Sequence, residues 1–113
     1  MAGPILRGTT PRIRVRLKTD DLLVGSIEAL EYKVWQDNYV LKFGINDVVV
    51  DTEANELIAH LTEEQTLKFK SKTSAKLRCR FKVGDEICGT REYQIQFTGD
   101  DVDGVLVDAS TSE

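Results

Sequence analysis

Hydrophobic and polar residues alternate with a period of two along most of this chain. From position 12 the sequence reads RIRVRLK, in which Ile13, Val15 and Leu17 share one face and the cationic side chains share the other. Because successive side chains of a strand point to opposite faces, this pattern predicts a half-buried β-strand over residues 12–18. Cations on the wet face of such a strand also deter edge-to-edge aggregation.

The same alternation predicts six further strands, separated by stretches with turn chemistry. We expect them at residues 27–36, 39–43, 48–51, 56–61, 75–83 and 86–97. The last two should form a hairpin with a two-residue turn at 84–85, which sets Phe81 opposite Cys88. The inward-facing residues of this strand then change from even-numbered positions at Cys88 to odd-numbered positions at Tyr93. One residue must be absorbed between them, and Gly89 is the natural place for a bulge.

One segment, LTEEQTLKF, breaks this rhythm. Thr62 precedes Gln65 by three residues, which is the spacing of a capping box, and two acids between them suit the positive end of a helix. The segment therefore predicts a single helical turn. We expect three apolar residues around this turn to close one end of the core: Leu61, Leu67 and Phe69.

These elements and the composition predict an all-β fold. The chain has 113 residues, 41% of them hydrophobic and 30% charged, which suits one domain with a modest core. We expect an immunoglobulin-like antiparallel β-sandwich of about seven strands with one short helical turn. The chain then divides into an N-terminal arm at residues 1–11, the sandwich at 12–98 and an acidic tail at 99–113.

Charge is distributed unevenly along the chain. The first eighteen residues carry five bases and no acid, the tail carries acids and no base, and the net charge is −4. The glycine- and proline-containing arm has little to bury by itself, so we expect it to reach onto a neighbouring subunit. The basic strand and the acidic tail complement each other, in one chain or head-to-tail between subunits, with apolar residues supplying most of the contact energy. The expected protein-interaction residues are Ile5, Leu6, Arg7, Arg12, Arg14, Arg16, Asp100, Asp101, Asp103, Val105, Leu106 and Val107.

The sequence shows no catalytic constellation, and we expect no enzyme activity, cofactor or metal. His60 is the only histidine and no nucleophile motif accompanies it. One histidine and two cysteines are too few for a zinc site. In DDVDG, an EF-hand register places Gly99 and Ser110 at positions that need acidic ligands. Cys79 and Cys88 fit small buried side chains of a protein made in a reducing cytoplasm. The alternative is a disulfide of poor geometry between diagonal neighbours.

Three further patterns concern nucleic acid, carbohydrate and membranes. The basic strand has no aromatic residue on its wet face, which argues against nucleic-acid binding. Trp35 and Tyr39 flank a turn and could form a sugar-binding platform; alternatively, Trp35 closes the core. No apolar run is long enough to span a membrane, and the first residues have no secretory pattern.

Several motifs resemble a group of small phage and prophage structural proteins of gut Firmicutes. The opening RGTTP, followed by an alternating strand, is similar to the start of that group, and LTEEQTLKFK resembles its LTQEETLxF stretch. The hairpin LRCRFKVGDEICGTREYQIQF and the closing DGVLVD are similar as well, whereas residues 25–50 depart from the pattern.

The resemblance implies a virion or virion-assembly protein, made in the cytoplasm of a host bacterium, and it implies no catalytic residues. We therefore expect a non-enzymatic tail, neck or capsid-decoration component that contacts other virion subunits as a homo-oligomer or in a symmetric assembly. The alternative is a carbohydrate-binding or host-adhesion module, which requires Trp35 and Tyr39 to be exposed on one face.

Overall fold

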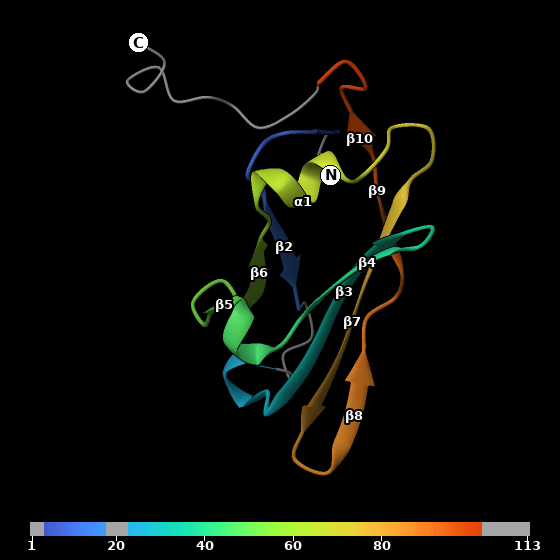
Figure 1. Cartoon of the computed structure of the whole chain (residues 1–113). Helices are drawn as coiled ribbons and strands as arrows, with labels where there is room; N and C mark the ends of the chain where they lie inside the picture. The colour runs from blue at the N-terminus through green and yellow to red at the C-terminus, as the bar shows by residue number, and fades with distance from the viewer. Residues whose placement is uncertain (1–3, 18–22, 103–113) are drawn as a thin grey trace.

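The computed structural model describes residues 4–17 and 23–102, and strands dominate this part of the chain (Figure 1). The elements, in order, are β1 (Ile5–Leu6), β2 (Arg12–Arg16), η1 (Val24–Ser26), β3 (Ala29–Gln36), β4 (Tyr39–Phe43), η2 (Ile45–Asp47), β5 (Val49–Asp51), β6 (Glu56–His60), α1 (Glu63–Leu67), β7 (Ala75–Val83), β8 (Glu86–Gly89), β9 (Tyr93–Ile95) and β10 (Phe97–Thr98).

The strands form two main antiparallel sheets and one small parallel pair. One sheet has the order β2-β6-β5; the other has the order β4-β3-β7-β8, and β9 also pairs with β7. β1 pairs in parallel with β10. The all-β antiparallel expectation is confirmed. Ten strands are described rather than about seven, because the strand expected at 86–97 is divided into three and because β1 was not anticipated.

The β7–β8 hairpin has the register that the sequence predicts. Val83 pairs with Glu86 and Phe81 pairs with Cys88 across a two-residue turn. Gly84 in that turn has φ +60°, which is the backbone conformation that a type II′ turn needs at its first central position. The pairing then moves by one residue between Gly89 and Tyr93, so the expected bulge is present, although the extra residue follows Gly89.

The core lies between the two main sheets. Both sheets contribute buried apolar residues to it: Val15, Leu57 and Ala59 from one, and Tyr32, Val34, Leu77, Cys79 and Phe81 from the other. The Tyr32 hydroxyl donates to the carbonyl of Ile13 at 2.8 Å and so links β3 to β2 across the core. This side chain is fully buried with its polar atom satisfied, as a buried hydroxyl requires.

Helix α1 closes one end of the sandwich, as the capping-box spacing predicts. Thr62 Oγ1 accepts from the backbone N–H of Gln65 at 3.1 Å, and Gln65 Oε1 accepts from the Thr62 N–H at 2.8 Å. Of the three apolar residues expected to close this end, Leu61 and Phe69 are buried and Leu67 is half-buried.

Candidate functional site

The N-terminal arm lies on its own domain. The backbone N–H groups of Ile5 and Arg7 donate to carbonyls of the β9–β10 segment at 2.8 and 2.9 Å. Ile5 packs against the core, while Leu6 is exposed. Residues 5–11 of the arm dock in cis because their backbone and side chains find partners on their own chain. The expected contact of the arm, residues 1–11, with a neighbouring subunit stays a prediction.

Arg7 joins both ends of the described chain. Its guanidinium donates to the backbone carbonyls of Leu67 and Phe69 at 2.6 Å each, of Gly99 at 2.9 Å and of Val102 at 3.0 Å. Arginine suits this role because its donors are fixed in a planar fork and it stays charged. Arg7 was expected at a subunit interface, but its guanidinium is already occupied within its own chain.

Two glycines allow this close docking. Gly8 has φ +78°, and a Cβ there would lie 2.7 Å from a side-chain carbon of Val102. Gly99 has φ +90°, and a Cβ there would lie 2.6 Å from a side-chain carbon of Leu6. Both positions therefore need the conformation and the small size of glycine. The RG pair of the opening motif thus has a structural role in holding the arm.

The acidic tail begins at the same end of the sandwich. Hydrogen bonding to Ser71 lowers the pKa of Asp100, and the positive charges of Arg7 and Lys72 lower it further. Asp101 is exposed. The remaining expected interaction residues of the tail lie outside the described residues: Asp103, Val105, Leu106 and Val107.

The cations of β2 are partly compensated within their own sheet. Arg14 and Arg16 lie 3.5 and 3.3 Å from the carboxylate of Glu56, whose side chain is only 10% exposed. Arg12 pairs with His60 across the strands, and both side chains are exposed. Because a buried carboxylate needs a cationic partner, two of the three arginines of β2 are already paired within the chain.

Trp35 and Tyr39 do not form a shared platform. Tyr39 pairs with Gln36 and therefore shares the inner face of the sheet, where its ring meets the Phe69 ring edge-on with centroids 4.9 Å apart. Trp35 pairs with Val40 and lies on the outer face. The alternative of a carbohydrate-binding module required both rings on one face, and the register of β3 and β4 places them on opposite faces.

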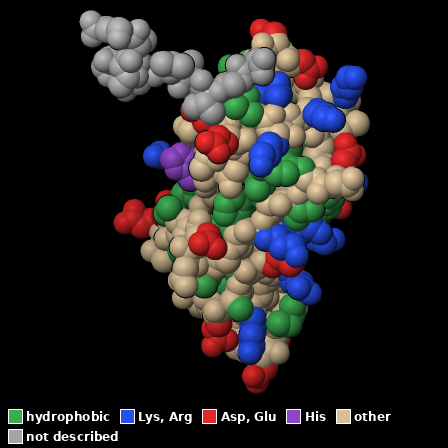
Figure 2. All heavy atoms as spheres, in the orientation of Figure 1, with side chains coloured by type: hydrophobic (Ala, Val, Ile, Leu, Met, Phe, Trp, Pro, Cys, Tyr) green, Lys and Arg blue, Asp and Glu red, His purple; other side chains and the backbone are tan. Residues whose placement is uncertain are grey.

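The outer face of the β4-β3-β7-β8 sheet is strongly basic. Six of the fifteen basic residues of the chain project from it: Lys33, Lys42, Lys76, Arg78, Arg80 and Lys82. Trp35, Val40 and Ile87 lie among them, and Val40 and Ile87 are 42% and 65% exposed. We call these nine residues the basic face. Figure 2 shows Lys and Arg side chains gathered on the side of the molecule that β3, β7 and β8 occupy in Figure 1.

Three cations of the basic face stand side by side. Lys33 of β3 is the direct cross-strand partner of Lys42 on β4 and of Arg78 on β7. Like charges directly opposite one another destabilise a sheet, so this row opposes folding of the isolated chain. Lys33 and Arg78 both lie over the ring of Trp35, at 4.7 and 5.4 Å from its centroid. These two cation–π contacts act against the repulsion.

Acidic residues neutralise only part of the basic face. Glu31 lies 3.9 Å from Lys42 and 3.8 Å from Arg80, and Glu92 lies 3.7 Å from Lys76. The other three cations form no ion pair with any residue that the structure describes: Lys33, Arg78 and Lys82. The basic face therefore presents unneutralised positive charge to solvent.

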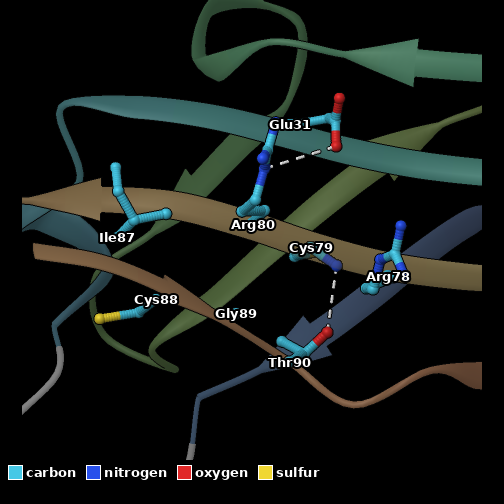
Figure 3. Close-up of a pocket in the computed structure, with 8 residues that line it drawn as sticks. All are labelled: Glu31, Arg78, Cys79, Arg80, Ile87, Cys88, Gly89 and Thr90. Atoms are coloured by element: carbon cyan, nitrogen blue, oxygen red, sulfur yellow. Dashed lines mark hydrogen bonds and ion pairs between the residues drawn. The ribbon is translucent and has the colours of Figure 1, made fainter.

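A shallow hollow of about 580 Å³ lies on this face beside the β7–β8 bulge (Figure 3). Its lining residues are Glu31, Arg78, Cys79, Arg80, Ile87, Cys88, Gly89 and Thr90. In Figure 3, Arg80 reaches towards Glu31, and Thr90 Oγ1 accepts from the Cys79 backbone N–H at 3.0 Å. The hollow is open to solvent and combines charged and apolar walls, which suits surface contact more than enclosure of a small molecule.

The two cysteines are free thiols that differ in environment. Cys79 is fully buried beside Tyr32, its cross-strand partner, whereas Cys88 is half-buried. Burial raises the pKa of the Cys79 thiol to about 12. Burial also raises the pKa of Tyr32, and the neighbouring Cys79 raises it further. A nucleophilic cysteine needs a lowered pKa, so Cys79 has the properties of a structural residue.

Because these pKa values are raised in the folded state, the stability of the fold decreases at alkaline pH. The neutral thiol of Cys79 is favoured in the folded state, so its contribution is complete below pH 9 and is lost as pH rises towards 12. We expect the free energy of unfolding to fall across that window, by up to about 1.4 kcal/mol per pH unit from one group. Urea titrations at several pH values should show a shallower decline in Cys79→Ala, and an unchanged slope would contradict the assignment.

The described residues contain no group of three or more His, Cys, Asp or Glu placed to hold a metal ion. Among them there is also no helix that is long and apolar enough to cross a membrane.

No protein-family model matches the chain, and comparison with the curated proteins finds no similar sequence. The basic face is therefore the feature of the described surface that most needs a functional explanation.

Proposed function

We propose that this protein is a non-enzymatic assembly subunit that acts through protein–protein contacts. The observation that carries the proposal is the basic face, where exposed cations and exposed apolar side chains share one sheet of a chain with a net charge of −4. A surface of this kind gives orientation and rapid encounter through charge, and contact energy through its apolar residues. The motif resemblance makes a phage tail, neck or capsid-decoration component the specific form of the proposal.

The immunoglobulin-like type of sandwich is part of this proposal. The orders β2-β6-β5 and β4-β3-β7-β8/β9 support it, because they correspond to the B-E-D and C′-C-F-G sheets of such domains. Counted in this way, β8 and β9 are one interrupted strand and the two sheets have seven strands. Domains of this type offer edges and sheet faces to partners, which is the use proposed here.

Two further points concern where such a subunit is made and what it contacts. Both cysteines are free, which supports synthesis in the reducing cytoplasm of a host bacterium, with the virion as the final location. The partners are other virion subunits, including copies of the same chain. No cofactor is part of the proposal.

The mass of the protein in solution tests this function. We expect light scattering to show an oligomer for the full chain that grows with concentration, and a monomer for a chain ending at Val102. That end point keeps the carbonyls of Gly99 and Val102 that Arg7 binds, so the shortened chain retains its docked arm. A full chain that stays monomeric at every concentration would contradict self-assembly.

A further inference from the structure

We propose that the basic face is the docking surface for the acidic C-terminal segment, residues 103–113, of a second copy of this chain. The inference rests on the proposed assembly function and names its partner. It moves the expected head-to-tail contact away from β2, because Arg14 and Arg16 already bind Glu56. It places the contact on the sheet face whose cations lack sufficient acids of their own.

The repulsive row on the basic face supports an anionic occupant. In this row Lys33 is the direct cross-strand neighbour of both Lys42 and Arg78. Repulsion between these like charges destabilises the sheet. A carboxylate placed between them would remove this repulsion and gain attraction from more than one cation at once. Binding of an acidic segment is therefore coupled to relief of a strain that the free subunit carries.

The tail and the basic face are complementary in charge, and both also carry apolar side chains. The segment after Val102, DGVLVDASTSE, combines three acids with valine and leucine and has no base. The basic face combines apolar side chains with charges of the opposite sign, because Trp35, Val40 and Ile87 lie among cations. A nucleic-acid backbone would use the charges but not the apolar residues, and the net charge of −4 works against a polyanion.

The tail is long enough to cover the basic face, and the proposed assembly function selects the face of a neighbouring copy. Eleven residues follow Val102, and in extended form they span about 36–40 Å, while the nine residues of β7 span about 30 Å. Arg7 and Ser71 hold residues 99–102 at the end of the sandwich that carries α1. Figure 1 shows that the β7–β8 turn, beside Lys82, lies at the opposite end. A face on one copy and a tail on the next form a heterologous contact, which builds rings or filaments.

Charge reversal on the full chain tests this contact. Lys33→Glu/Lys82→Glu changes two face cations that have no ion pair among the described residues, and we expect it to weaken self-association at least tenfold in sedimentation velocity. Thermal unfolding should show a folded variant of near-unchanged stability, because Lys33→Glu removes the contact of Lys33 with the Trp35 ring but replaces repulsion by attraction in the row. The control Arg12→Glu/Lys70→Glu makes the same change in net charge at exposed positions elsewhere and should associate like the unmodified chain.

A charge exchange identifies the partner. Asp103→Lys/Asp108→Lys in the tail should also abolish association by itself, while mixing this variant with Lys33→Glu/Lys82→Glu should restore a complex. Restoration only when all four changes are in one chain would assign the tail to its own face and overturn the second-copy contact. If the unmodified chain associates but neither variant affects it, the docking surface is wrong and the assembly function stands. If the unmodified chain is monomeric, both are wrong, and face-dependent binding of a labelled oligonucleotide would then assign the face to nucleic acid.

Discussion

Phe69→Ala should lower the free energy of unfolding by about 3–5 kcal/mol, the range for truncating a buried phenylalanine. Phe69 is fully buried, and its ring stacks on Phe97 with centroids 4.4 Å apart and an interplanar angle of 4°. The ring of Tyr39 meets it edge-on. Truncation would leave a cavity where α1, β4 and β10 meet, and little of the surrounding backbone is free to collapse into it. Urea unfolding followed by tryptophan fluorescence measures the loss.

Two matched variants separate the cavity from other effects of the change. Phe69→Leu keeps most of the volume and should cost less than about 1.5–2 kcal/mol. Phe43→Ala removes a phenylalanine that is only half-buried, at the end of β4, and should cost clearly less than Phe69→Ala. If Phe69→Ala cost no more than Phe43→Ala, the end of the sandwich closed by α1 would not be a packed part of the core.

Arg7→Ala should cost about 2–4 kcal/mol and release the N-terminal arm. Its guanidinium serves four backbone carbonyls, and hydrogen bonds from charged groups are worth about 1.5–3 kcal/mol each without being additive. The carbonyls of Leu67 and Phe69 would lose their donor, and the parallel pairing of β1 with β10 would lose its anchor. Amide hydrogen exchange should therefore accelerate at Ile5 and at residue 7 more than in β3 or β7.

Two controls test whether the fork of Arg7 matters rather than its charge. Arg7→Lys should restore only part of the stability, because one ammonium cannot reach carbonyls in four directions. Arg12→Ala removes an exposed arginine from the next strand and should change the free energy of unfolding by no more than about 0.5 kcal/mol. Equal exchange rates at Ile5 in Arg7→Ala and in the unmodified chain would mean that the arm is held without the guanidinium.

The cis docking of the arm has a consequence for assembly. A chain whose residues 5–11 were free would depend on a neighbour to order them, whereas here Arg7, Gly8 and Thr66 order them within the subunit. Residues 99–102 are ordered by the same contacts. In the proposed assembly, residues 5–11 are therefore ordered before a partner binds, and the energy of tail binding need not order them as well.

Local pattern was sufficient for most of the secondary structure. The period-two alternation located the strands because it reports directly which side of each strand is buried. The Thr62–Gln65 spacing located α1, and the change of inward-facing positions between Cys88 and Tyr93 required a bulge. In each case the determining interaction spans only a few residues, so the sequence contains all of it.

What only the tertiary structure decided was which cations stand together on the basic face. The outward Lys76, Arg78, Arg80 and Lys82 are visible in AKLRCRFKV, but nothing in that segment shows that β3 sets Lys33 beside Arg78. Likewise, the sequence shows that bases are concentrated in the first eighteen residues, but not that Glu56 pairs with Arg14 and Arg16 or that backbone carbonyls surround Arg7. Alternation along one strand determines which face a residue takes. Only pairing between distant strands determines which charges become neighbours, because those contacts depend on register across segments far apart in the chain.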